Sequence, residues 1–196
     1  MNIRRLIRPL LLCSIALLVC YALLFFLNAR SPAYLTQATT EAVINGKRVS
    51  ITYGRPSING PAIAGRDLFS VAPVGFVWRF GRNEATLIES TGRLVVGGQE
   101  LAAGKYTLWA RRVGEDKWVI SFHPSTRGWS GKPLWGDRMG GRARVQSGFI
   151  ADLVLTGGEA SDSAELLDIK LTEDRGNAVL KIHFGKVTQT GTFGVN

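Results

Sequence analysis

The densest group of side chains that could bind a ligand combines two arginines, a glutamate, an asparagine, a tyrosine and a tryptophan. These residues are Tyr53, Arg55, Trp78, Arg79, Asn83 and Glu84. Arginine supplies forked donors that match a carboxylate, and an indole ring supplies a face for stacking. The group could therefore hold a carboxylate or a carbohydrate.

The same residues also have a structural interpretation, which we favour on the sequence. An ion pair of Arg79 and Glu84 beside a tryptophan can fix a loop across the open end of a β-sandwich. Gly81 would permit the turn, and Asn83 and Thr86 would satisfy backbone groups. The prediction is loop fixation, with ligand binding as the alternative.

Catalytic patterns are weak in this sequence. His123 and His183 are the only histidines, and two histidines in separate strands do not make a zinc pattern. His183 alternates with apolar residues and is expected to face solvent. Ser121, Ser125 and Ser130 lie near His123, which leaves a hydrolase around His123 as an alternative, although no nucleophile-elbow motif supports it. We therefore predict no catalytic residue, no metal site and no cofactor.

The elements that must position these residues have the pattern of β-strands. Segments 35–44 and 47–53 flank Asn45-Gly46, a dipeptide typical of type I′ hairpin turns. A second turn is expected at Gly176-Asn177. Apolar and polar residues alternate over residues 76–80, 106–111, 118–122, 167–172 and 180–184. Short strands separated by glycine-rich turns predict an all-β sandwich, jelly-roll-like or related.

Three motifs within residues 51–110 resemble a widespread family of exported bacterial proteins known only as a domain of unknown function. The family pattern is YxRPxxxG, then VWRxGxNEAT, then GGxxLxAGxYxLW. This chain has YGRPS at residues 53–57, VWRFGRNEAT at 77–86 and GGQELAAGKYTLW at 97–109. It departs from the family at His123, where asparagine is common. The resemblance implies a β-sandwich and export, and it implies no reaction.

The N-terminal segment predicts a membrane anchor. Residues 10–27 read LLLCSIALLVCYALLFFL, without a charge. As a helix they would be roughly 27 Å long, close to the hydrocarbon thickness of a bilayer. Arg4, Arg5 and Arg8 precede the segment and only Arg30 follows it closely, so the N-terminus is expected in the cytoplasm. A cleaved signal peptide is the alternative, but signal peptides usually have an apolar region of ~7–15 residues.

These patterns divide the chain into a cytoplasmic N-terminus at 1–8, a transmembrane helix at 9–29, a tether at 30–40 and an exported β-sandwich domain at 41–196. Both cysteines, Cys13 and Cys20, fall in the helix, so the exported domain has no disulfide. A long irregular segment at 124–141 contains Trp129 and Trp135, whose rings need burial over the sandwich or in a partner.

The charge of the protein limits its partners. The formal net charge is +9, and without the four arginines of residues 1–30 it is +5, with no run of lysine or arginine. Nucleic acid is therefore not an expected partner. The expected partners are other integral membrane or periplasmic proteins and membrane lipid. The candidate contact residues are Trp129, Trp135, Tyr21 and Phe25.

The leading hypothesis from the sequence is a non-enzymatic interaction module. It would be anchored in the bacterial inner membrane, with its sandwich in the periplasm, as an accessory or structural subunit of a larger membrane protein complex. A photosynthetic reaction-centre assembly is one such complex. The alternatives are a periplasmic domain that binds carbohydrate or carboxylate, and the hydrolase around His123.

Overall fold

The computed structural model describes residues 14, 16–24, 37–59, 68–82, 85–124 and 147–196. The protein divides into two compact units, Met1–Thr36 and Gln37–Asn196. The first unit contains a helix, described at Ser14 and at residues 16–24, and the second unit contains every strand that the structure describes. We describe each unit by itself.

The N-terminal helix carries exposed apolar side chains. Their exposed fractions lie between 60% and 72%, in Leu17, Leu18, Val19, Tyr21, Leu23 and Leu24. Of the predicted transmembrane segment 9–29, the structure describes residues 14 and 16–24. Within the part that is described, no helix is both long enough and apolar enough to cross a membrane.

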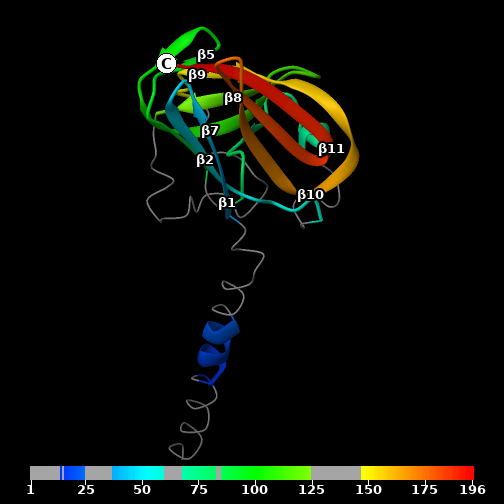
Figure 1. The fold of residues 1–196 in the computed structure, drawn as a ribbon. Helices are drawn as coiled ribbons and strands as arrows, with labels where there is room; N and C mark the ends of the chain where they lie inside the picture. Colours follow the sequence, from blue (N-terminus) through cyan, green and yellow to red (C-terminus); the bar gives the residue numbers. More distant parts are fainter. Residues whose placement is uncertain (1–13, 15, 25–36, 60–67, 83–84, 125–146) are drawn as a thin grey trace, which may run out of the picture. The chain divides into compact units, whose positions relative to one another are not determined.

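The larger sheet of the second unit is antiparallel, and half of its strand pairs join strands that are consecutive in sequence (Figure 1). A further short strand, β3 (Val77–Trp78), pairs with β7. Among the described residues the order across the sheet is β1 (Gln37–Ile44), β2 (Lys47–Gly54), β4 (Thr86–Ser90), β7 (Gly104–Arg112), β8 (Trp118–His123) and β9 (Ala151–Val154).

The smaller sheet is dominated by one long, curved hairpin (Figure 1). Its order, over the described residues, is β10 (Thr156–Asp174), β11 (Asn177–Val195), β5 (Leu94–Val96) and β6 (Gln99–Leu101). The register of β10 against β11 shifts twice between Glu159 and Asp168. At each shift β10 has more residues than β11, as in a β-bulge, and such an irregularity bends a strand and strengthens its twist.

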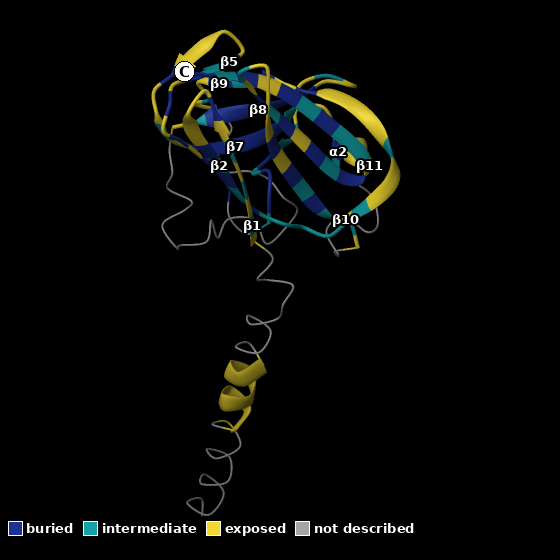
Figure 2. Cartoon of the chain, viewed as in Figure 1, coloured by how far each residue is buried: buried dark blue, intermediate teal, exposed yellow. Residues whose placement is uncertain are grey.

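The core lies between the two sheets. Tyr106, Leu108 and Ala110 of β7 are buried there, as are Ile182 and Phe184 of β11. Figure 2 shows the alternation of buried and exposed residues along β11, and the exposed part of β10 where it bends. A short helix, α2 (Leu68–Val71), adds Phe69 to the core. The predicted β-sandwich is confirmed.

The first predicted hairpin is confirmed. Asn45 and Gly46 have φ angles of 50° and 75° and join β1 to β2 through the pair Ile44 and Lys47. Positive φ at both central residues is the type I′ geometry. The side-chain amide of Asn45 also donates to the carbonyls of Gly176 at 2.8 Å and Val195 at 2.9 Å. The turn therefore also contacts the smaller sheet.

Replacing Gly46 by valine should lower the free energy of unfolding by about 1 kcal/mol or more. A Cβ at this position meets nothing within 4 Å, so the cost arises from the positive φ and not from a clash. Gly46→Asn is the control, because asparagine tolerates this conformation. Urea denaturation followed by tryptophan fluorescence measures both variants. Equal midpoints for valine and asparagine would contradict the prediction.

The second predicted turn is shifted by one residue. The central residues are Arg175 and Gly176, with φ angles of 49° and 78°, and Asn177 already pairs with Asp174 in the sheet. Glycine therefore takes the second position of the turn and not the first. The predicted position at Gly176-Asn177 was wrong because the register of the long hairpin, and not the dipeptide alone, decides where the turn falls.

Candidate functional site

Tyr53 of the predicted group links the two sheets. Its hydroxyl accepts a hydrogen bond from the backbone N–H of Ile169 at 3.0 Å and donates one to the carbonyl of the same residue at 3.3 Å. Ile169 lies on β10, at the edge of the smaller sheet, and Tyr53 is buried. Burial raises the pKa of the phenol, because the charged form is poorly solvated there. Tyr53 thus binds backbone groups that β11 does not reach.

Arg55 continues this connection at the end of β2. Its Nε donates to the carbonyl of Leu167 at 2.9 Å, and its Nη2 lies 3.9 Å from Oδ1 of Asp168. The backbone N–H of Leu167 donates in turn to the carbonyl of Pro56 at 3.0 Å. The residues of the first motif therefore make contacts within the sandwich, where they join the end of β2 in the larger sheet to the edge strand β10 of the smaller sheet.

Trp78 is enclosed by other aromatic rings. Its ring is edge-on to Phe80 at 5.6 Å and to Phe69 at 6.1 Å, and it stacks on Phe184 at 6.4 Å, between centroids. The indole N–H donates to the carbonyl of Gly81 at 3.2 Å. A buried indole with a satisfied N–H is typical of a core residue. It presents no free face to a sugar or a carboxylate.

The loop after Trp78 is closed by Thr86. The backbone N–H of Thr86 donates to the carbonyl of Arg79 at 3.1 Å, and its hydroxyl donates to the carbonyl of Phe80. Thr86 therefore satisfies backbone groups as the sequence suggested. The predicted partners Asn83 and Glu84 lie outside the described residues, so the ion pair with Arg79 stays a prediction.

Of the four predicted partner-contact residues, the structure describes one. Trp129, Trp135 and Phe25 lie outside the described residues. Tyr21 lies in the N-terminal helix with 71% of its side chain exposed. It remains a candidate contact.

The two histidines are far apart in the topology. His123 ends β8, with its ring edge-on to Phe149 at 6.0 Å, and His183 lies in the middle of β11. His183 is on the face opposite the core, as predicted, but it is only partly exposed. Its Nε2 is buried and has no hydrogen-bond partner among the described residues.

A polar cluster that the sequence did not predict lies beside His123, on the outer face of the larger sheet. Nε of Arg111 donates to Oγ of Ser121 at 2.6 Å, and Nη2 of Arg111 donates to Oδ2 of Asp152 at 2.7 Å. The hydroxyl of Ser121 donates to Oδ1 of Asp152 at 2.6 Å. The guanidinium also lies over the ring of Phe149, with 4.6 Å from Cζ to the centroid.

This cluster does not have the arrangement of a nucleophile and its base. The proton of Ser121 goes to Asp152, and Arg111 donates to the same oxygen. A serine nucleophile needs a base that removes its proton and is itself oriented by a third group. Here the guanidinium and the carboxylate are bonded directly to each other, and the serine hydroxyl bridges them a second time. The arrangement positions an arginine more readily than it activates a hydroxyl.

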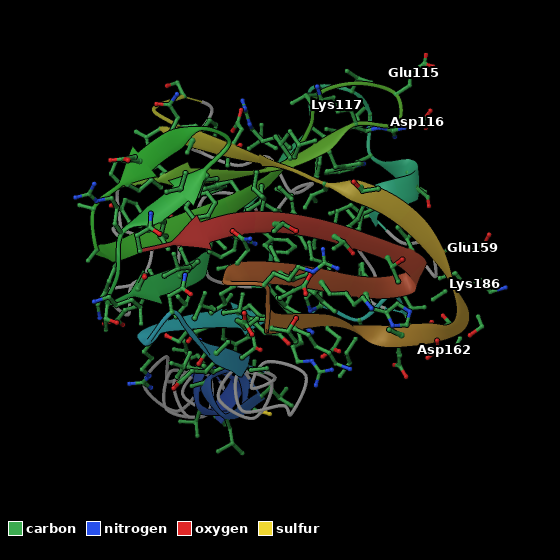
Figure 3. The ribbon with its side chains drawn as sticks, turned by 45° about the horizontal axis from the view of Figure 1, so that its top comes forward. Glu115, Asp116, Lys117, Glu159, Asp162 and Lys186 are labelled. Atoms are coloured by element: carbon green, nitrogen blue, oxygen red, sulfur yellow. The ribbon has the colours of Figure 1, made fainter. Side chains whose placement is uncertain are left out.

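Other charged side chains lie on the outside of the sandwich, away from this cluster. Figure 3 shows two such groups on the outside, one at the β7–β8 turn and one where β10 bends. The first group is Glu115, Asp116 and Lys117, and the second is Glu159, Asp162 and Lys186. In the described ranges no three acidic, histidine or cysteine side chains are arranged to hold a metal ion.

The fold and these contacts define an all-β sandwich protein whose motif residues hold its own sheets together. Residues 35–190 match the family described as "Protein of unknown function (DUF2911)". The protein belongs to this family. No curated protein and no solved structure matches it.

Proposed function

We propose that this protein is a non-enzymatic interaction module, anchored in the bacterial inner membrane by its N-terminal helix. Its sandwich would lie in the periplasm, as an accessory or structural subunit of a larger membrane protein complex. The exposed apolar surface of the N-terminal helix is the observation that carries this proposal.

That surface surrounds the helix. Leu17, Leu18 and Val19 are consecutive and all at least 61% exposed, and successive residues of an α-helix point about 100° apart. A helix that is apolar on all sides belongs inside a membrane or inside a protein core. Lipid and the helices of partner proteins both offer such surroundings. The uncharged run of residues 10–27 extends the same character along the sequence.

The distribution of arginines supports the orientation. Arg4, Arg5 and Arg8 stand before the apolar run and Arg30 follows it. Positive charge is retained on the cytoplasmic side of a membrane, so the sandwich would be translocated.

Contacts within the sandwich support a non-enzymatic role. Tyr53, Arg55 and Trp78 make hydrogen bonds to the protein's own backbone. Ser121 is bonded to both Arg111 and Asp152. These side chains hold strands and orient one another, which favours a structural role for them over a catalytic one.

A reporter enzyme that works only in the periplasm should be active when it is fused after Asn196. A reporter that works only in the cytoplasm, fused at the same place, should be inactive, because the arginine bias keeps only the N-terminus inside. The reverse pattern would contradict the orientation. Mass spectrometry of the mature protein shows whether the N-terminal helix is kept. An N-terminus near Tyr34 would show that the helix is removed as a signal peptide.

Partner binding is tested by purification of the full-length protein in mild detergent. A subunit should elute with other proteins at a fixed stoichiometry, which mass spectrometry can identify. A photosynthetic reaction-centre assembly is one of the complexes that this experiment would reveal. Elution of the protein alone, from membranes in which it is expressed at its natural level, would contradict the role as a subunit.

A further inference from the structure

The outer face of β9 has an apolar surface interrupted by one charge. Ile150, Asp152 and Val154 alternate with the buried residues of this strand region and therefore share one face. Ile150 is 40% exposed and Val154 is 54% exposed. Arg111 reaches Asp152 between them, and Phe149 covers one side of its guanidinium. We call Arg111, Phe149, Ile150, Asp152 and Val154 the β9 face.

Arg111 is held in place by hydrogen bonds that use only some of its N–H donors. A guanidinium has five N–H donors, and those to Ser121 and Asp152 use one on Nε and one on Nη2. Within the described residues Nη1 has no hydrogen-bond partner. The remaining donors on Nη1 and Nη2 form the end of the guanidinium fork, which matches a second carboxylate in plane.

The surroundings distinguish Arg111 from an ordinary surface arginine. Arg48 donates through the same two nitrogens, Nε and Nη2, and both of its bonds go to the carboxylate of Glu41, at 2.6 Å each. Its side chain is 64% exposed, whereas that of Arg111 is 24% exposed. Partial burial weakens the competition from water, and contacts with three residues fix the orientation of Arg111 before any ligand arrives.

We infer that the β9 face is the surface on which this protein binds its partner, and that the partner contributes a carboxylate flanked by apolar side chains. The carboxylate accepts hydrogen bonds from the free end of the Arg111 fork. The apolar side chains cover Ile150 and Val154, an area that a small free acid would leave exposed to water. Arginine next to apolar contacts is typical of the residues that dominate binding energy at interfaces. This inference rests on the proposed function, because it names the surface of the same interaction.

Two substitutions test the surface in the full-length protein, purified in mild detergent with its co-eluting partners. Val154→Glu places a like charge beside the incoming carboxylate at an exposed position, where folding is little affected. Arg111→Lys keeps the charge but removes the planar fork. We expect each to reduce the amount of retained partner at least tenfold. The matched controls are Val43→Glu, at a position 63% exposed on β1, and Arg48→Lys. Each control should change the amount of retained partner less than twofold.

A photo-reactive amino acid at Ile150 then identifies what lies on the β9 face. The cross-linked segment should belong to the partner and contain an aspartate, a glutamate or the partner's terminal carboxylate. Cross-linking to lipid, to a second copy of this protein or to a segment without a carboxylate would overturn the inference. If Val154→Glu and Arg111→Lys both retain the partner, the β9 face is not the interface and the proposed function stands. If the wild-type protein retains no partner, the proposed function itself fails and the inference falls with it.

Discussion

Replacing Tyr53 by phenylalanine should destabilise the sandwich by about 2–4 kcal/mol. The hydroxyl serves both the N–H and the carbonyl of Ile169, and phenylalanine leaves both backbone groups without a partner in a buried place. An unsatisfied buried polar group costs about 1–3 kcal/mol, which is more than the hydrogen bond itself contributes. Urea denaturation of the full-length protein in detergent, followed by tryptophan fluorescence, measures the change in the free energy of unfolding.

Tyr106→Phe is the matched control for this substitution. The hydroxyl of Tyr106 donates to one carbonyl, that of Ala102, at 2.8 Å, and Ala102 is exposed, so water can replace the bond. Its loss should cost about 1 kcal/mol or less. Equal losses of stability for the two variants would contradict the linking role that we assign to Tyr53.

The same residue gives the sandwich a dependence on alkaline pH. Burial raises the pKa of Tyr53 in the folded state above its ordinary value of 10.0, so folding favours the protonated phenol. The resulting stability is complete below pH 10.0 and is lost as the pH rises through the folded pKa, because the unfolded protein releases its proton first. The phenylalanine variant should lack this part of the alkaline loss of stability.

Local patterns were sufficient to predict the elements whose pairing is local. Asn45-Gly46 has the backbone preference of one turn type, and the alternation around it on both sides fixes which residues face the core. The same holds for residues 106–111 and 118–122, where alternation alone separates Tyr106 and Leu108 from Thr107 and Trp109. In such hairpins the sequence contains both the turn and the two faces.

The long hairpin of the smaller sheet could not be predicted in full for a physical reason. Strands β10 and β11 continue to Thr156 and Val195, well beyond the predicted segments. Glycines at 157, 158, 185 and 191 and the polar run around Asp162 interrupt the alternation on which the prediction depended. The shifts in register allow the pairing to continue along the hairpin, because extra residues on one strand are absorbed without ending it. No local pattern indicates that continuation.

The contacts of the predicted site show a similar limit. The sequence singled out Tyr53 and Arg55, but their partners Ile169 and Leu167 lie 116 and 112 residues away. Those partners are backbone groups of apolar residues, which carry no signal of their own in the sequence. Residue type was therefore enough to identify Tyr53 and Arg55 as notable side chains. Their role in joining the two sheets depends on the topology, which the sequence pattern does not show.

The Arg111 cluster was missed because its members come from separate elements. Alternation places Arg111 on the outer face of β7 and Ser121 on the outer face of β8. Asp152 comes from β9, a strand of four residues whose pattern is too short to recognise, and its register against β8 brings it opposite Ser121. The polar residues on the outward faces of β7 and β8 could have indicated part of the cluster from the sequence. The position of Asp152 beside them could not be predicted.

Replacing Gly97 by alanine should destabilise the sandwich by about 2–5 kcal/mol, from two separate costs. Gly97 has a φ of 56°, a conformation that costs a residue with a Cβ about 1–2 kcal/mol. A Cβ there would also lie 2.4 Å from the carbonyl oxygen of Asp152, a backbone atom that cannot move without shifting β9. Relief of such a clash typically costs about 1–3 kcal/mol more.

The neighbouring glycine separates these costs. Gly98 has a φ of 82°, but a Cβ there meets nothing within 4 Å, so Gly98→Ala should lose only the conformational part, about 1–2 kcal/mol. The difference between the two variants in urea denaturation then measures the contact with Asp152. Because Asp152 also holds Arg111, Gly97→Ala should in addition weaken retention of the partner by the β9 face, and Gly98→Ala should leave it intact. Equal unfolding free energies for the two alanine variants would show that β9 yields freely at Asp152, and the rigid placement of Arg111 would then be wrong.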